Sequence, residues 1–224
     1  MSGKFMSVTC EALSVKKQFF GVKAVAFDVY GTLVHIGDPR RPYRRLLSEL
    51  NTLGRAPRTD NGARIMKLDV GLAEAAELLG MTLPGDVLQE LTVDLSAELA
   101  SIRLFEDAIP AIRLLQSRGL PIGLCSNLAG PYAKPVQALL PQLDAYAWSF
   151  AVGAVKPEPH MYSYLCDALD ASPEQVLMVG DTLSADYEGP RSFGMQACHL
   201  ARKRTSEAKV WISTLLELES LIGS

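Results

Sequence analysis

The sequence has no apolar run that approaches the roughly 20 residues a helix needs to span a bilayer. Residues 1–21 also lack the uninterrupted apolar core of a signal peptide. Lysine and arginine together number 22 against 25 aspartates and glutamates, so no excess of charge favours nucleic acid or an anionic membrane as a partner. We therefore expect a cytoplasmic protein that acts on a small molecule, with no nucleic-acid partner and no membrane partner.

Cysteine is sparse as well. Cys10, Cys125, Cys166 and Cys198 lie far apart and form no Cys-x-x-Cys pair. This spacing indicates reduced thiols in a core, and it argues against a disulfide framework or a zinc site. The 224 residues are enough for one full domain, or for a main domain with a small insertion.

Short apolar runs recur along the chain, and each ends in a polar or small residue: residues 22–27, 120–125, 147–152, 176–180 and 195–200. The first is apolar on both faces, as expected of a central parallel strand that is covered by helices on either side. Helical spacing lies between the runs, at residues 109–117, 132–140 and 159–169. Thr214 and Glu217 have the spacing of a capping box before a last helix. The alternation predicts an α/β fold with a doubly wound parallel sheet.

The alternation stops between about residues 38 and 102, where only helical patterns punctuated by proline and glycine remain. This segment begins after the first strand and its loop and ends before the helix that leads to the second strand. Both of its connections therefore lie at one edge of the core, where a lid is expected. We expect residues 22–37 and 103–224 to form the core, residues 38–102 a helical lid, and residues 1–21 an N-terminal extension.

Polar side chains follow the predicted strands, at the edge where an open parallel sheet binds its ligands. Asp28 follows the first strand, Ser126 and Asn127 the second, and Asp181 the fourth. Lys156 lies in the loop after the third. Each residue alone is more often a cap, a turn or a surface residue than a catalytic one. Together they bring carboxylates, a hydroxyl and an ammonium to one edge, which predicts an active site there.

The segments DVYGT (28–32), CSN (125–127), GAVKPEP (153–159) and GDTLSAD (180–186) resemble, in this order, the four motifs of the haloacid dehalogenase superfamily of hydrolases. The resemblance covers nearly the whole chain from Val22 onward. It implies a Rossmann-like core with an inserted helical cap of the family's first type, at residues 38–102. It also implies an enzyme that acts through a covalent aspartyl intermediate.

The resemblance also implies roles for the candidate residues. Asp28 would be the nucleophile, and its ester intermediate would split one difficult displacement into two easier ones. Lys156 would neutralise charge, while Ser126 and the backbone amides around Tyr30 would bind the phosphoryl oxygens. Thr32, which closes the first motif, and Asn127, which follows Ser126 in the second, complete the candidate catalytic set.

Magnesium is the cofactor that the resemblance implies for a phosphatase. This ion takes oxygen ligands in an octahedron and keeps several waters. Its protein ligands would be a carboxylate oxygen of Asp28, the backbone carbonyl of Tyr30 and the carboxylate of Asp181. Asp186 would orient a metal-bound water or Lys156 from behind these ligands.

Tyr30 departs from the family's phosphatases, which carry an aspartate there as general acid and base. DxYGT is similar to the first motif of the 2-haloacid dehalogenases, which displace a halide without a metal and need no proton donor. Gly180-Asp181, however, has the metal-binding form, where those dehalogenases carry a Ser-Asn pair. We favour a magnesium-dependent phosphatase of a small phosphorylated metabolite over a dehalogenase of a 2-haloacid.

A third hypothesis is a ligand-binding module of low turnover that lacks its general acid. The retention of Asp28, Lys156 and Asp181 argues against it, because a binding module needs no nucleophile beside a metal ligand. The substrate depends on lid residues whose direction one sequence does not show. Arg44 and Arg45 are candidates for binding a carboxylate or a second phosphate of the substrate, although such a pair on a helix is usually solvated.

Overall fold

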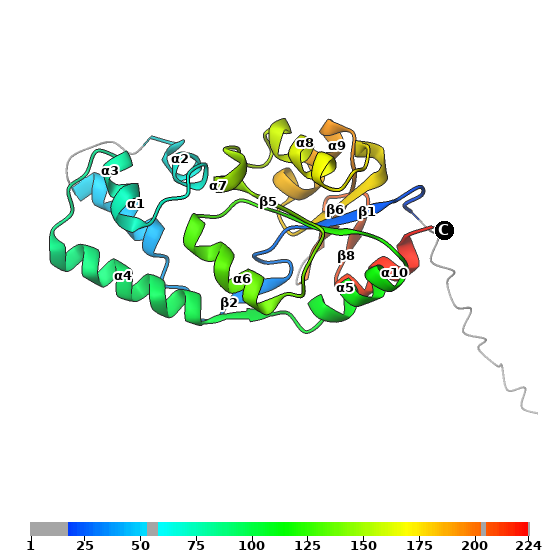
Figure 1. Ribbon diagram of the computed structural model, residues 1–224, viewed down its shortest axis with the longest axis horizontal. Coiled ribbons are helices and arrows are strands. Elements are labelled where there is room, and N and C mark those ends of the chain that lie inside the picture. The colour runs from blue at the N-terminus through cyan, green and yellow to red at the C-terminus, as the bar shows by residue number, and fades with distance from the viewer. Residues whose placement is uncertain (1–17, 53–57, 203–204, 224) are drawn as a thin grey trace, which may run out of the picture.

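Parallel strands form the central sheet of the protein, in the order β5-β4-β1-β6-β7-β8 (Figure 1). The computed structural model describes residues 18–52, 58–202 and 205–223. The strands of the sheet are β1 (Ala24–Phe27), β4 (Ile122–Ser126), β5 (Ala145–Trp148), β6 (Val176–Gly180), β7 (Gln196–Leu200) and β8 (Trp211–Ile212). Since β1 lies between β4 and β6, the strand order reverses there, and a ligand site is expected at the carboxyl end of β1.

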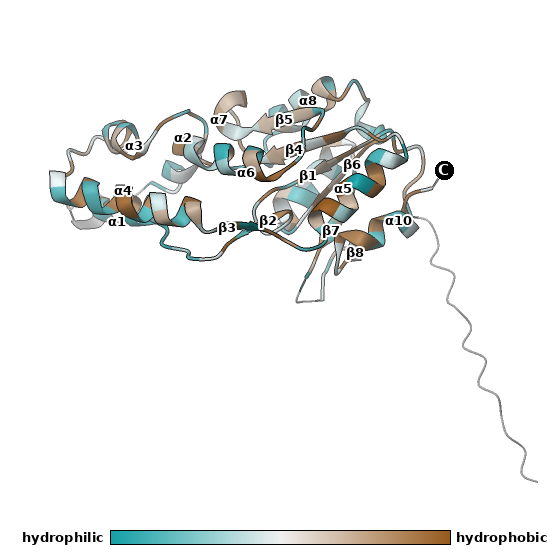
Figure 2. Ribbon diagram, turned by 60° about the horizontal axis from the view of Figure 1, so that its bottom comes forward, coloured by the Kyte–Doolittle hydropathy of each residue, from teal (hydrophilic) through white to brown (hydrophobic). Residues whose placement is uncertain are grey.

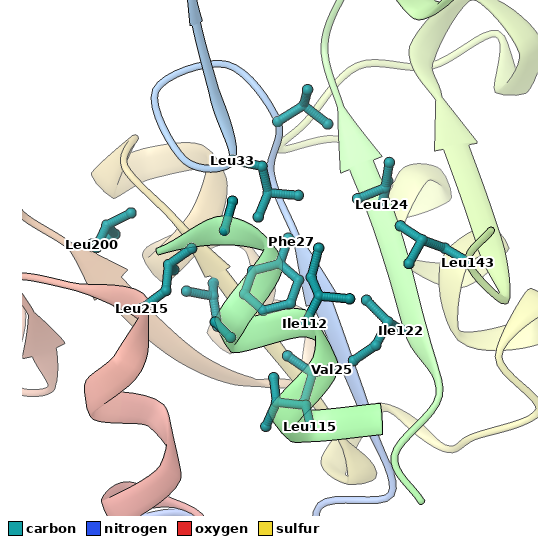
Figure 3. Close-up of a cluster of buried hydrophobic side chains, with 14 of the residues drawn as sticks. Val25, Phe27, Leu33, Ile112, Leu115, Ile122, Leu124, Leu143, Leu200 and Leu215 are labelled. Atoms are coloured by element: carbon teal, nitrogen blue, oxygen red, sulfur yellow. The ribbon is translucent and has the colours of Figure 1, made fainter. Parts of the chain in front are cut away.

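Both faces of β1 are buried, because alternate side chains enter two different hydrophobic clusters. Val25 and Phe27 pack into the cluster that α5 (Ala108–Ser117) covers, and Figure 3 shows their contact with Ile112 and Leu115 of that helix. The small residues between them face the second cluster, which α8 (Pro159–Ala168) covers. This two-sided burial explains why the strand is apolar throughout, and it confirms the prediction of a doubly wound α/β fold.

Shorter helical segments complete the layers around the sheet. Those on the chain after β4 are η1 (Gly130–Tyr132), α6 (Ala133–Leu139), α7 (Ser149–Val152), η2 (Pro173–Gln175), η3 (Leu183–Glu188), α9 (Gly189–Phe193), η4 (Leu215–Glu217) and α10 (Leu218–Leu221). The predicted capping box is present, since Thr214 and Glu217 each bond to the other's backbone at the start of η4. None of the helices in the described part of the chain combines the length and the hydrophobicity that a bilayer span requires.

A helical unit lies beside the sheet, between two short antiparallel strands (Figure 1). The strands are β2 (Val34–Ile36) and β3 (Ile102–Leu104), and the helices are α1 (Pro42–Thr52), α2 (Asn61–Met66), α3 (Leu72–Leu78) and α4 (Gly85–Ala100). The unit has its own hydrophobic cluster, and Figure 2 shows the alternation of polar and apolar turns along α4. Ala129 and Tyr132, which follow β4, pack into this cluster and join the unit to the sheet.

One predicted strand, at residues 147–152, has the wrong bounds. The strand β5 is Ala145–Trp148, and the chain then turns into the short helix α7. Ser149 fixes the turn, because its hydroxyl bonds both to the N–H and to the carbonyl of Leu128. Periodicity alone cannot separate strand from helix in so short an apolar run.

The short strands β2, β3 and β8 were not predicted from the sequence. With two or three residues each, they carry too little pattern to be recognised. Ile102, expected at the end of the helical segment, is the first residue of β3. Residues 1–17, which make up most of the predicted N-terminal extension and include Cys10, lie outside the described residues, while the other three cysteines are buried free thiols.

Candidate active site

Four of the predicted site residues meet directly beyond the carboxyl end of β1. The ammonium of Lys156 lies 2.8 Å from Asp28 Oδ1 and 2.6 Å from Asp186 Oδ1. The hydroxyl of Ser126 donates to the same Asp28 oxygen over 3.1 Å. Each of these residues comes from a different strand end or loop, so the sheet edge brings them together as the sequence predicted.

Lys156 is a buried cation held between two carboxylates. Burial alone would lower its pKa, but Asp186 and Asp28 outweigh that effect and raise the pKa above its ordinary value. The side chain therefore stays charged. Because an unpaired carboxylate is costly in such a site, the ammonium also stabilises the negative charge of Asp28.

Asn127 and Thr182 fix the positions of Lys156 and Asp186. The amide of Asn127 donates to the carbonyl of Lys156 over 2.8 Å and accepts from its N–H over 2.7 Å. The N–H of Thr182 donates to Asp186 Oδ2 over 2.9 Å, which leaves Oδ1 for the lysine. The sequence placed Asn127 among the catalytic candidates, and the structure places its side chain on the backbone that carries Lys156.

Three carboxylates gather at this site. Asp28, Asp181 and Asp186 each offer an oxygen, and these oxygens lie within 4.8 Å of one another. Desolvation and the charge of Asp28 raise the pKa of Asp181 to about 6. Burial likewise raises the pKa of Asp186. A divalent cation would relieve this repulsion, and an all-oxygen set of donors fits magnesium.

Gly31 allows the first-motif loop to approach Asp181. Its φ of +92° lies in the region that favours glycine, and a Cβ on it would stand 2.3 Å from Asp181 Oδ2. Any other residue would push Asp181 away from Asp28. The glycine of DVYGT thus sets the distance between the two carboxylates.

The side chain of Tyr30 points toward the helical unit. Its hydroxyl donates to the carbonyl of Tyr132 over 3.0 Å, and the two rings meet edge to face with centroids 5.8 Å apart. Burial, with a smaller effect from the charge of Glu98, raises the pKa of Tyr30. The phenol proton is therefore held by a backbone carbonyl, which makes Tyr30 a poor general acid.

A comparison with known protein families identifies the family of the chain. The sequence profile of the haloacid dehalogenase-like hydrolases matches residues 22–194, which include every predicted site residue. The chain belongs to this family.

Proteins similar to this hydrolase in sequence or in fold include phosphatases and a dehalogenase. Phosphoglycolate phosphatase of Haemophilus influenzae is 27% identical over 180 residues, which cover 71% of this chain and 77% of that protein. A HAD phosphatase of Thermococcus onnurineus has a similar structure, with a TM-score of 0.61 and 26% identity over 88% of this chain and 96% of that one. The 2-haloacid dehalogenase of Pseudomonas syringae pv. Tomato DC3000 shares the fold, with a TM-score of 0.63 and 18% identity over 89% of this chain and 97% of that one.

Thr32 of the hydrolase is fully buried, and its hydroxyl finds no partner among the described residues. The Thr32 carbonyl accepts from the guanidinium of Arg202 over 2.7 Å, and Arg202 also pairs with Asp107. The threonine thus anchors the first-motif loop to the chain after β7.

His199 was not among the residues predicted for the site. Its Nε2 lies 3.0 Å from the carbonyl of Asp181, and its Nδ1 lies 2.5 Å from the hydroxyl of Ser206. His199 pairs with Gly180 across the β6–β7 ladder, so it holds the backbone of Asp181 from the neighbouring strand. Its place near the end of a predicted strand was the only signal in the sequence.

Proposed function

We propose that this hydrolase cleaves a phosphate ester of a small molecule, with magnesium as cofactor and Asp28 as nucleophile. The observation that supports this proposal best is Asp181, a second carboxylate held against the nucleophile with a raised pKa. A displacement of halide from carbon needs one carboxylate, and a neighbouring negative charge is of no use to it. A cation bound between Asp28, Asp181 and a phosphate would offset the repulsion between the two carboxylates.

The hydrogen bonds of Asp28 select which oxygen attacks. Oδ1 accepts from both Lys156 and Ser126. Oδ2 takes part in none of the hydrogen bonds of the described residues, so it is free to form the bond to phosphorus as the bond from phosphorus to the leaving oxygen breaks. Water then hydrolyses the aspartyl phosphate and regenerates the carboxylate.

Asp28, Asp181 and the backbone carbonyl of Tyr30 would hold the magnesium ion. When bound, the ion supplies positive charge that lets an anionic substrate approach an anionic nucleophile. Asp186 is committed to Lys156 and to the N–H of Thr182, so it acts from behind these ligands. Lys156 keeps a third N–H for a phosphoryl oxygen, since two of its three are used on Asp28 and Asp186. The Ser126 hydroxyl, whose one proton goes to Asp28, would turn to donate to a phosphoryl oxygen instead.

The helical unit at residues 38–102 would serve as a cap over the core formed by residues 22–37 and 103–224. Its helices approach the site through Tyr132, which packs into their hydrophobic cluster and receives the Tyr30 hydroxyl on its carbonyl. A lid in this place would exclude bulk water from the site while Asp28 attacks, and it would choose the leaving group. The phosphatase names among the relatives support a small phosphorylated substrate.

A 2-haloacid dehalogenase is the second candidate, and Tyr30 is the observation that favours it. The tyrosine leaves the site without an acid, and a halide needs no proton when it departs.

One experiment separates the candidates. The purified protein is assayed on a panel of phosphate esters and on 2-chloropropionate, with magnesium and with EDTA. Release of phosphate that EDTA abolishes and magnesium restores is the expected result. Release of chloride that EDTA does not affect would contradict the phosphatase proposal and favour the dehalogenase. Binding without turnover of any compound would indicate a ligand-binding module.

A further inference from the structure

Arg202, on the chain after β7, contacts both strands that join the helical unit to the sheet, at their bases. Thr32 lies just before β2, and Phe105 follows β3 directly. The guanidinium of Arg202 donates to the Thr32 carbonyl over 2.7 Å, and its carbon lies 3.9 Å from the centre of the Phe105 ring. The N–H of Phe105 also donates to the carbonyl of Leu33 over 2.9 Å, so the two strand bases are bonded to each other as well.

Asp107 fixes the direction of this guanidinium. Its two carboxylate oxygens accept from the two terminal nitrogens of Arg202, over 2.8 and 2.9 Å. One of these oxygens also accepts from the Thr214 hydroxyl over 2.7 Å and from the N–H of Leu215 over 2.9 Å. A fork paired with a carboxylate and a ring stacked on its face both constrain the plane of a guanidinium. The bond from Arg202 to the Thr32 carbonyl is therefore directional.

The Thr32 carbonyl belongs to the turn that shapes the proposed magnesium site. The N–H groups of residues 31, 33 and 34 donate to carbonyls of the same turn, residues 29–34, over 2.8 to 2.9 Å. These internal bonds make the turn one unit. The unit carries the Tyr30 carbonyl, a proposed ligand, and Gly31, which lies against Asp181. An anchor on Thr32 thus sets the position of both.

The two carboxylate ligands are placed by the sheet, whereas the carbonyl ligand is not. Asp28 follows β1, and its N–H donates to the carbonyl of Val179 in β6 over 2.9 Å, while Asp181 follows β6 directly. Tyr30 lies beyond the strand, in the turn. Hydrogen bonds from outside reach this turn at the Tyr30 hydroxyl and at the carbonyls of residues 32 and 33, and the bond from Arg202 is the charge-assisted one.

We infer that Arg202 is a positioning residue of the proposed hydrolase. By holding the turn at Thr32, it keeps the Tyr30 carbonyl at the place where it shares one magnesium ion with Asp28 and Asp181. The inference rests on the proposed function and assigns the site a residue outside its four motifs. Because Phe105 begins the chain that returns from the helical unit, the same anchor ties the base of that unit to the magnesium site.

The test replaces Arg202 by lysine, which keeps the positive charge but has neither a fork for Asp107 nor a planar group for Phe105. A magnesium titration of the protein without substrate, followed by the shift in Tm, gives the Kd of the ion. Arg202→Lys should raise this Kd by about tenfold, the lower end of the range for groups that orient metal ligands. Phe105→Leu, which removes the ring and keeps the fork, should act in the same direction with a smaller effect.

Arg118→Lys is the matched control. Arg118 also donates to two backbone carbonyls, at residues 219 and 222, but it lies before β4, at the opposite edge of the sheet from the site. Its replacement should lower the free energy of unfolding without changing the Kd for magnesium. A Kd that rises equally in Arg118→Lys and Arg202→Lys would overturn the inference, because general destabilisation would then explain both results.

Amide hydrogen exchange without magnesium provides a second measurement. The amides of residues 31–34 should exchange faster in Arg202→Lys than in the parent, relative to those of α8, and Arg118→Lys should leave this ratio unchanged. Faster exchange with an unchanged Kd for magnesium would overturn the inference, because Arg202 would then stabilise the turn without positioning a ligand.

Failure of the proposed function gives a different pattern of results. If the parent binds no magnesium and releases no phosphate from any ester, the phosphatase proposal fails. The exchange measurement then decides the role of Arg202 by itself, since unchanged exchange of residues 31–34 in Arg202→Lys overturns the anchor and faster exchange supports it. If the parent and Arg202→Lys bind magnesium equally well, the inference fails while the phosphatase proposal stands.

Discussion

Substitution of Tyr30 by aspartate should change which phosphate esters the enzyme hydrolyses. The phenol of Tyr30 donates its proton to the Tyr132 carbonyl, so in the parent the leaving oxygen must depart unprotonated or take a proton from water. Aryl phosphates should therefore turn over while simple alkyl phosphates lag. An aspartate at position 30 would have Asp28 and Asp181 as neighbours, and their charges would raise its pKa and keep it protonated as an acid.

The expected gain follows from general acid catalysis, which is worth roughly 100 to 10,000-fold for a poor leaving group. It acts on alkyl esters and leaves aryl esters almost unchanged, so the alkyl-to-aryl rate ratio should rise by a similar factor. The structural cost is the Tyr30–Tyr132 hydrogen bond, about 1 kcal/mol, together with the packing of the ring. The cost affects both classes of ester and cancels in the ratio.

The assay measures initial rates of phosphate release from a matched series of esters under saturating magnesium. Tyr30→Asn is the control, because it removes the phenol and supplies a side chain of nearly the same shape as aspartate without an acidic proton. Equal ratios in Tyr30→Asp and Tyr30→Asn would refute the reasoning. Such a result would mean that position 30 does not supply the missing acid and that another leaving group, such as halide, suits this site better.

Three further outcomes are expected. Asp28→Asn should abolish turnover while circular dichroism shows an intact fold, and more than a few per cent of the parent rate would contradict its role as nucleophile. Magnesium should raise the Tm of the parent and raise it less in Asp181→Asn, whereas equal shifts would place the ion elsewhere. Burial acts to raise the pKa of Asp107, but hydrogen bonds from Arg202, Thr214 and a backbone N–H outweigh burial and lower this pKa. The ionised Asp107 therefore stabilises the fold at neutral pH, and this stabilisation is lost as the pH falls through the pKa of the folded state. Asp107→Asn should therefore lower the free energy of unfolding by about 1–3 kcal/mol at pH 7 and by progressively less in acid. The control Glu106→Gln, at an exposed residue, should not show this loss. A cost of Asp107→Asn that does not change with pH would refute this assignment.

The sequence predicted the sheet and the place of the site because both depend on local pattern. An apolar run followed by a polar residue marks a strand and its carboxyl end, and parallel strands bring those ends to one edge. Asp28, Ser126 and Lys156 were found in this way, and they do meet. The boundary of β5 was missed because the run at residues 147–152 is apolar through both the strand and the helix that follows.

Contacts between the helical unit and the sheet could not be predicted in the same way. The bond from Tyr30 to Tyr132 spans 102 positions, and the bond from Tyr132 to Glu98 spans 34, with no motif at either end. The sequence also offered Arg44 and Arg45 together as substrate-binding candidates. The structure separates them, because α4 supplies acids to Arg45 and none to Arg44. The direction of a side chain on a helix relative to its neighbours depends on tertiary packing, which one sequence does not record.

Tyr30 favours a particular kind of leaving group. A site without an acid at this position selects a leaving group that is stable as an anion, and a phenolate is more stable than an alkoxide. The hydrogen bond that removes Tyr30 from proton transfer also ties the first-motif loop to Tyr132, which packs into the hydrophobic cluster of the helical unit. An aryl phosphate would therefore suit this site better than a simple alkyl phosphate, whose leaving oxygen needs a proton.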